Sequence, residues 1–221
     1  MMNVKHTPPV DADTGLQHLL AGNQRFSAGR PSHPRRTLQT LAEVAGEQHP
    51  FAVVLGCSDS RVPPEIIFDQ GLGDLCVARI AGPVVDDAVL GSIELAVVNL
   101  GIRLIVVLGH EHCAAVEAAV RALHPPLAAG APAIWTWQAG WTPVTVAQSE
   151  NLGCVTRAII PAVARVTEGP GTLLERAIRS NIALVVEQLR ASAPVQAMGE
   201  QVRVVGAYYS LHTGQVHLTA T

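Results

Sequence analysis

Three short apolar segments, separated by stretches long enough for helices, constrain the fold of this 221-residue chain more than any other feature. They occupy residues 51–56, 75–80 and 103–109, and the stretches between them predict helices near 63–68 and 86–100. Apolar runs that alternate with helices are typical of parallel strands joined by right-handed crossovers, with helices covering both faces of the sheet. The sequence therefore predicts an α/β fold with a mostly parallel central sheet flanked by helices.

Further elements are expected on either side of this alternation. Additional helices are predicted at residues 14–30, 38–46, 111–123, 144–168 and 172–192. Thr14 is the expected N-cap of the first of them. Residues 202–209 and 215–218, separated by turn residues, predict an antiparallel hairpin at the C-terminal edge of the sheet. The length is that of one domain with a full core.

Charge and hydropathy argue against two classes of partner. The net charge is −3, and no cluster of basic residues with interleaved aromatic residues is present, so no nucleic acid is expected to bind. No apolar stretch approaches the roughly 18 residues needed to cross a bilayer, and the polar segment Met1–Pro9 does not resemble a secretory signal. We therefore expect a soluble, cytoplasmic protein that does not bind membranes.

Two motifs directly follow two of the apolar segments: CSDSR at residues 57–61 and HEHC at residues 110–113. Because sites in parallel sheets form outside the carboxyl ends of the strands, we expect both motifs to meet at one edge. Cysteine and histidine ligands favour zinc over magnesium or calcium. The candidate metal ligands are Cys57, His110, Cys113 and, conditionally, Asp59.

Asp59 and Arg61 leave two interpretations of the fourth metal position. The carboxylate and the guanidinium can form a bidentate ion pair, which leaves that position to water. Alternatively, Asp59 binds the metal and closes the site, as in a zinc site that only stabilises the fold. The charged pair favours a catalytic site, because a structural site needs no arginine beside it.

The remaining cysteines are expected to have other roles. Four cysteines at irregular spacing do not make a disulfide framework. Cys154, in a helical stretch, is predicted to pack as a small hydrophobic residue. Cys76, near the predicted end of its strand, is an alternative fourth ligand in place of Asp59.

At these residues the chain resembles the beta-class carbonic anhydrases, in their plant-like and bacterial branch, which carry Cys-x-Asp-x-Arg followed by His-x-x-Cys. Residues 22–26, 66–74, 91–94 and 205–209 are also similar to family segments, so the resemblance covers most of residues 20–218. It implies one domain over residues 1–221. Its parts would be an N-terminal helical arm at 1–46, a zinc-site α/β core at 47–124, a tryptophan-rich loop at 125–143, and C-terminal helices and strand at 144–221.

The resemblance implies a zinc lyase, a carbonic anhydrase with one Zn²⁺ per chain held by Cys57, His110 and Cys113. The Asp59–Arg61 pair would control the fourth position, with Asp59 on the metal only in a closed state. Zinc-bound hydroxide would attack carbon dioxide to give bicarbonate and a proton. The resemblance also implies a homodimer or homotetramer in which the leading helix embraces a neighbour and the pocket is shared between subunits.

The same resemblance assigns further residues to the substrate pocket. Gln48 matches an amide that hydrogen-bonds substrate and bicarbonate, and backbone N–H groups around Ala114 could bind an anionic oxygen. Cys76 and Leu95 stand where the plant-like branch has an aromatic residue and a tyrosine, so the pocket would be roomier and less polar.

Cys76, Leu95, Pro83 and His112 differ from the usual family pattern, so alternatives to carbon dioxide hydration stay open. One is a hydrolase of carbonyl sulfide or carbon disulfide on the same zinc. Another is a catalytically silent zinc protein that senses bicarbonate or supports assembly. His112 either relays protons or simply faces water. The three tryptophans of the chain, all between residues 124 and 143, mark either a lid or interface loop or a surface excursion.

Overall fold

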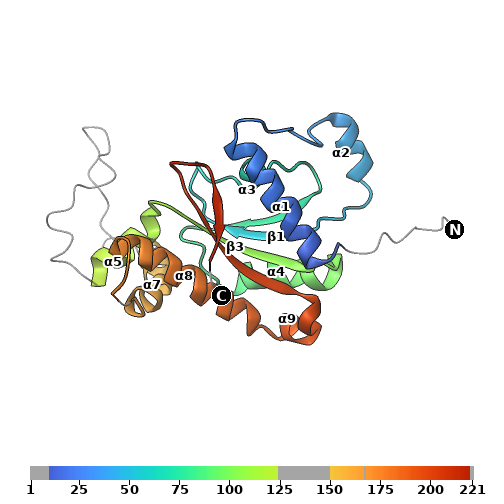
Figure 1. The fold of residues 1–221 in the computed structure, drawn as a ribbon. Helices are drawn as coiled ribbons and strands as arrows, with labels where there is room; N and C mark the ends of the chain where they lie inside the picture. The colour runs from blue at the N-terminus through green and yellow to red at the C-terminus, as the bar shows by residue number, and fades with distance from the viewer. Residues whose placement is uncertain (1–9, 124–149, 167, 220–221) are drawn as a thin grey trace.

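One five-stranded sheet forms the centre of the computed structural model, which describes residues 10–123, 150–166 and 168–219 (Figure 1). Its strand order is β2-β1-β3-β4-β5. The strands are β1 (Ala52–Gly56), β2 (Leu75–Arg79), β3 (Leu104–His110), β4 (Arg203–Tyr209) and β5 (Val216–Leu218). The first four are parallel and β5 runs antiparallel to β4, which confirms the mostly parallel sheet with an antiparallel edge.

Helices cover both faces of this sheet. They are α1 (Ala12–Ser27), α2 (Leu38–Val44), α3 (Pro64–Ile67), α4 (Asp87–Leu100), α5 (Ala114–Leu123), α7 (Glu150–Ala164), α8 (Leu173–Arg190), α9 (Ala193–Met198) and the 3-10 turn η2 (Gly199–Gln201). The chain passes from β1 to β2 in one direction across the sheet, and from β2 to β3 and on to β4 in the other. Right-handed crossovers therefore place α3 on one face, and α4 and α8 on the opposite face.

The central strands are buried along their whole length. Every residue of β1 and of β3 is buried. Such strands are apolar on both faces because helices cover each side, which explains why their sequences show continuous apolar runs rather than alternation. In Figure 1, α1 lies across the strands of the sheet, next to α3.

Two details of the predicted elements are wrong. The N-cap of α1 is Asp11, whose side chain accepts hydrogen bonds from the backbone N–H and the hydroxyl of Thr14. Thr14 therefore lies inside the first turn as a donor to the cap. Helix α9 was not predicted, because its six residues are too few to show a helical period; it begins after Ser192, with a proline in the first turn.

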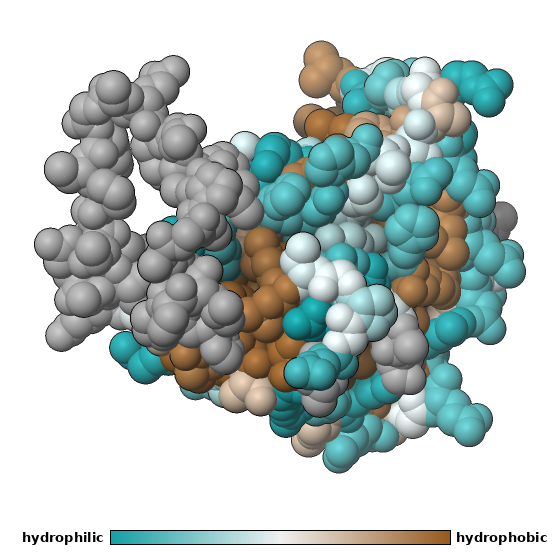
Figure 2. Space-filling model, turned by 60° about the vertical axis from the view of Figure 1, so that its left-hand side comes forward, coloured by the Kyte–Doolittle hydropathy of each residue, from teal (hydrophilic) through white to brown (hydrophobic). Residues whose placement is uncertain are grey.

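Some expectations fall outside the described residues. These are the tryptophan-rich loop at 125–143 and the beginning of the helix predicted at 144–168. None of the described helices has the length and apolarity to cross a membrane. The cytoplasmic location stays a prediction. On the face turned forward in Figure 2, brown hydrophobic surface is exposed in the centre of the view, beside the atoms drawn in grey.

Candidate metal centre

The two sequence motifs meet at the carboxyl edge of the sheet, between β1 and β3. These neighbouring strands connect onward in opposite directions, so this edge is the topological switch point at which α/β folds bind ligands. Cys57 follows β1 directly and His110 ends β3. The ligand atoms of Cys57, His110 and Cys113 all lie within 4.8 Å of one another, and all three residues are buried. We call these three residues the buried cluster.

The imidazole of His110 is oriented by the backbone. Its Nδ1 lies 2.8 Å from the carbonyl oxygen of Glu111 and must donate to it, since a carbonyl only accepts. In the neutral imidazole, this bond makes Nε2 the nitrogen with the free lone pair. Among the described residues, this buried Nε2 has no hydrogen-bond partner. A buried polar atom without a partner is costly, and a bound cation at Nε2 would remove that cost.

The two thiols of the buried cluster share a proton. A hydrogen bond from Cys113 lowers the pKa of Cys57, against the opposing effect of burial, and His110 and the Gly82 N–H lower it further. The same hydrogen bond, together with burial, raises the pKa of Cys113. The contact between the two sulfurs therefore favours a thiolate at Cys57, and a thiolate is the form of cysteine that binds metal ions. Two sulfur donors and one imidazole nitrogen fit a soft or borderline divalent cation.

The loop after β2 supports Cys57, and sequence reasoning did not find it. The backbone N–H of Gly82 donates to the Cys57 Sγ at 3.4 Å, and Asn181 of α8 donates to the Gly82 carbonyl at 2.9 Å. Gly82 has a φ of 68°, and a Cβ there would lie 2.6 Å from Cδ1 of Ile159. Only glycine therefore fits. The Gly-Pro pair at 82–83 signals a turn, but not its contact with Cys57.

A second missed residue, Arg79, ties the Cys57 loop to the end of β2. Its Nε donates to the carbonyl oxygen of Cys57 at 2.9 Å, and its Nη2 donates to the carbonyl oxygen of Asp59. Because both acceptors are backbone groups, no pattern of side chains in the motif pointed to this arginine.

Asp59 and Arg61 form the bidentate ion pair. Arg61 donates from Nε to Oδ1 at 2.9 Å and from Nη2 to Oδ2 at 2.6 Å, and its backbone N–H also donates to Oδ1. The hydrogen bond from Arg61 lowers the pKa of the Asp59 carboxyl. The carboxylate is thus ionised at neutral pH and engaged by the guanidinium. Of the two interpretations of Asp59, this geometry agrees with the one in which the carboxylate pairs with Arg61 and does not bind a metal.

Three other candidate residues lie away from the buried cluster of their own chain. Cys76 is the second residue of β2 and pairs with Val53, so it does not lie near the carboxyl end of its strand as expected. At about 3.3 Å per residue it is about 13 Å from Cys57 along the sheet, too far to be a fourth ligand. Gln48 precedes β1, at the opposite edge, and lines a separate cavity of about 390 Å³. Leu95 is exposed on α4.

Ala114 and Cys154 complete the set of predicted positions. Ala114 is the first residue of α5 and directly follows Cys113, so the structure places it at the buried cluster. Cys154 is exposed on α7, and the prediction that it packs as a small hydrophobic residue is wrong. The apolar neighbours in its sequence, including the buried Ile159, lie at other positions around the helix.

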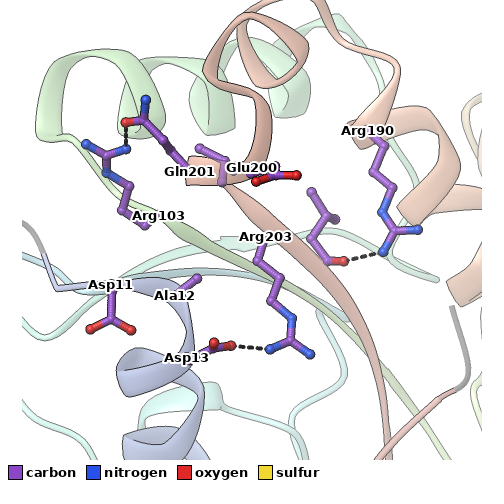
Figure 3. Close-up of a pocket in the computed structure, with 10 residues that line it drawn as sticks. Asp11, Ala12, Asp13, Arg103, Arg190, Glu200, Gln201 and Arg203 are labelled. Carbon is purple, nitrogen blue, oxygen red and sulfur yellow. Dashed lines mark hydrogen bonds and ion pairs between the residues drawn. The ribbon is translucent and has the colours of Figure 1, made fainter.

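A larger cavity, of about 780 Å³, lies at the amino edge of β4, away from the buried cluster (Figure 3). Three arginines line it, and each has a partner. Arg203 pairs with Asp13, Arg103 donates to Gln201, and Arg190 donates to a backbone carbonyl. These contacts join β4 to α1 and to α8, and η2 to the segment before β3, which accounts for the three arginines structurally.

Comparisons with known proteins point to one family. Residues 52–216 match the family model described as carbonic anhydrase. Carbonic anhydrase 2 of Mycobacterium tuberculosis is 56% identical over 119 residues, which cover 54% of this chain and 56% of that protein. The carbonic anhydrase of Mycolicibacterium smegmatis is 58% identical over 102 residues, 46% of this chain and 50% of that protein. The chain thus spans about half the length of the curated relatives it matches.

Solved structures share the fold. The beta-carbonic anhydrase CcaA superposes with a TM-score of 0.64 at 24% identity, covering 93% of this chain and 92% of that chain. A tetrameric beta-carbonic anhydrase of Sordaria macrospora superposes with a TM-score of 0.65 at 18% identity, covering 93% and 97%. At these identities the likeness concerns the fold.

Proposed function

The chain belongs to the beta class of the carbonic anhydrase family, and we therefore propose that it catalyses the reversible hydration of carbon dioxide to bicarbonate and a proton. One observation carries the proposal most directly. The buried Nε2 of His110 has no partner among the described residues and lies within 4.8 Å of two cysteine sulfurs. A cation among the three atoms would give this nitrogen a partner and balance the charge of a thiolate beside it.

We infer that the cation is Zn²⁺, one per chain, held by Cys57, His110 and Cys113. Two sulfurs and an imidazole are ligands that zinc accepts in tetrahedral geometry, and three protein ligands with one open position are typical of catalytic rather than structural zinc. When bound, zinc supplies Lewis acidity that brings the ionisation of water close to neutral pH.

The Asp59–Arg61 pair keeps the fourth position open in this proposal. Arg61 occupies both carboxylate oxygens, so Asp59 is held as an ionised acceptor rather than a metal ligand. An ionised carboxylate can only accept hydrogen bonds, so it orients a water beside the cluster with a proton toward Asp59. The backbone N–H of Ala114, at the N-terminus of α5, is proposed to bind the anionic oxygen of bicarbonate.

A partner subunit is proposed to complete the pocket. Gln48 and Cys76 lie too far from their own buried cluster to contact the same substrate, and Leu95 is exposed on α4, but a symmetric partner could bring its copies to this cluster. Several large apolar side chains are exposed on one chain, as expected if a second chain covers some of them: Leu38, Leu41, Leu72, Leu95 and Val98. The Sordaria macrospora relatives are tetramers. We propose a homodimer or homotetramer.

Stopped-flow hydration of carbon dioxide, with elemental analysis of the same sample, tests the function. We expect about one zinc per chain and hydration above the buffer rate. Cys113→Ser should lose metal affinity and lower hydration at least about 100-fold, because one thiolate ligand is gone. Cys154→Ser is the matched control, since this exposed thiol lies outside the cluster, and should retain both.

Two outcomes would favour the alternatives from the sequence. Hydration at buffer background from about pH 6.5 to 9, despite stoichiometric zinc, would indicate a silent bicarbonate sensor or assembly protein. Faster turnover of carbonyl sulfide or carbon disulfide than of carbon dioxide in parallel assays would indicate the hydrolase.

A further inference from the structure

A second group of potential ligands lies next to the buried cluster, on the surface. It consists of Glu111, His112 and His212, whose ligand atoms lie within 4.8 Å of one another. We call it the surface cluster. Nδ1 of His212 is 2.9 Å from Oε2 of Glu111, and Nε2 of His112 is 3.8 Å from Oε1. The residues come from two segments far apart in the chain, the loop between β3 and α5 and the turn between β4 and β5.

The Glu111 carboxylate is fixed in place by the turn that carries His212. Its Oε2 accepts hydrogen bonds from the backbone N–H groups of Leu211 and His212, at 3.0 and 3.4 Å, and from the hydroxyl of Ser210 at 3.2 Å. The backbone N–H of Glu111 in turn donates to the carbonyl of Tyr209. Ligating carboxylates in metal sites are themselves hydrogen-bonded in this way, which orients the remaining oxygen. Here Oε1 is the oxygen that faces His112.

The two imidazoles are held on either side of this carboxylate and are reached by water. The ring centroids of His112 and His212 are 5.9 Å apart. Their side chains are 38% and 72% exposed, and that of Glu111 is 23% exposed. His112 adopts a φ of 55°, a conformation uncommon for a residue other than glycine. A cation could therefore enter from solvent without any rearrangement of the core.

We propose that Glu111, His112 and His212 form a second metal site, for a borderline divalent cation such as Zn²⁺, Co²⁺ or Ni²⁺. Ligand atoms around a tetrahedral ion with bonds of about 2.0–2.1 Å lie about 3.4 Å apart. The distances of 3.8 Å from His112 to Oε1 and 2.9 Å from His212 to Oε2 lie on either side of that value. Imidazole ligands select against calcium and magnesium. With three ligands and an exposed position, the site leaves room for water and binds more weakly than the buried cluster.

The surface cluster is in direct contact with the proposed catalytic residues. His112 stands between two members of the buried cluster in the sequence, and its carbonyl oxygen lies 3.4 Å from Nη2 of Arg61, which donates to it. A cation on the surface cluster therefore fixes the loop that carries His110 and Cys113. It also adds positive charge beside the Asp59–Arg61 pair. Metal bound at the surface cluster can therefore influence the buried cluster.

Titration of the zinc-loaded protein with Co²⁺ tests this site. The starting material is the full chain with one Zn²⁺ per chain by elemental analysis. We expect one further equivalent of Co²⁺ to bind, with d–d absorption but without thiolate-to-cobalt charge transfer, because the surface cluster has only nitrogen and oxygen ligands. In His212→Ala, the dissociation constant of this equivalent should rise at least tenfold.

Two further variants make the result specific. His112→Asn should weaken Co²⁺ binding by a similar factor, since asparagine tolerates the positive φ but lacks the imidazole. His217→Ala, an exposed histidine on β5 outside the surface cluster, should bind as the unmodified protein does. The proposal is overturned if the unmodified protein takes up no Co²⁺ of this spectral type, or if His212→Ala and His112→Asn bind it as tightly as His217→Ala does.

Discussion

Arg61 is the residue whose contacts bear most directly on the proposed chemistry. Its Nε and Nη2 donate to the two carboxylate oxygens of Asp59, at 2.9 and 2.6 Å, and so hold a carboxylate that could otherwise bind the metal. The pKa of Asp59 is lowered by this contact, so protonation does not release the pair near neutral pH. The pair is present above the ordinary carboxyl pKa and is lost only as the pH falls through the lower, folded-state value.

Arg61→Ala should therefore lose hydration while keeping its metal. Without the guanidinium, Asp59 is free to take the fourth metal position, and we expect the rate to fall at least about 100-fold. Stopped-flow assays with elemental analysis measure both properties. Arg165→Ala, which removes an exposed ion pair with Glu187, is the control and should change neither. Retention of the rate within a factor of two would contradict the gating role.

Asp69 is a second residue whose ionisation should make the stability of the fold depend on pH. It is fully buried and accepts hydrogen bonds from Arg25, from the backbone and hydroxyl of Ser32, and from the backbone of His33. Burial raises the pKa of Asp69, but these hydrogen bonds together hold it far below its ordinary value. Its contribution to stability is thus fully present above about pH 4, the value for an unfolded chain, and declines as the pH falls further.

Asp69→Asn should destabilise the protein in a pH-dependent way. At pH 7 we expect a loss of about 2–4 kcal/mol in the free energy of unfolding, because buried donors lose an ionised acceptor. The difference from the unmodified protein should narrow as the pH falls below about 4. Urea denaturation at several pH values measures this. Asp13→Asn, on an exposed pair, should have little effect. A difference that is constant with pH would contradict the assignment.

Candidate ligands could be recognised from the sequence where they belong to a short motif. Cys57, His110 and Cys113 could be singled out because they belong to two short motifs at the ends of apolar strands. Gly82, Arg79 and Asn181 could not, because they support Cys57 through backbone groups contributed by distant segments. Cys76 was misplaced although the bounds of its strand were nearly right, because it is the second residue of β2 and so lies far from the carboxyl edge that carries Cys57.

At the scale of elements, the packing of α1 against the α3 segment depends on one glycine. A Cβ at Gly22 would lie 1.8 Å from the carbonyl oxygen of Phe68, which is backbone and cannot move aside without shifting the chain. The two segments can approach this closely only because position 22 has no side chain.

Gly22→Ala should cost about 3 kcal/mol or more of unfolding free energy, because the added methyl group forces the two segments apart. Gly91→Ala is the matched control within α4. No atom lies within 4 Å of a Cβ there, so the better helix propensity of alanine should leave stability unchanged or raise it by up to about 1 kcal/mol. Urea denaturation compares them. Equal effects of the two substitutions would contradict the close approach at Gly22.

Element types were predictable where the apolar pattern was long and regular. The strands around 51–56, 75–80 and 103–109 appear within one or two residues of their expected bounds, and so do the helices between them. The N-cap of α1 was misassigned because Asp11 and Thr14 are both good capping residues, and only the geometry shows which one accepts the hydrogen bond.

At the scale of the whole molecule, the strand order could not be read from the sequence. Alternating strands and helices predict a parallel sheet, but several orders satisfy that pattern. The order found here makes β1 and β3 neighbours, which is what brings Cys57 to His110. Gln48 precedes β1 and so lies at the edge opposite Cys57, and the proposed substrate pocket therefore depends on a second chain.

Leu95→Glu should weaken association of the chain with itself. The Leu95 side chain and its neighbour Val98 are 57% and 61% exposed on α4, and a carboxylate buried at an interface without a partner is strongly unfavourable. We expect the variant to sediment as a monomer at micromolar concentration and to lose hydration in parallel. Leu123→Glu, on α5, is the control. An unchanged sedimentation coefficient for Leu95→Glu would exclude this face of α4 from the interface.

The position of the buried cluster on two different strands has a consequence for the apo-protein. A cation shared by Cys57 and His110 closes the long chain segment 57–110 that contains β2 and α4, much as a covalent cross-link would. Closing a loop of this length restricts the unfolded chain by about 4 kcal/mol of entropy in the cross-link model. A chelator that extracts the cation should therefore lower the thermal unfolding midpoint of the entire domain, although every covalent bond stays intact.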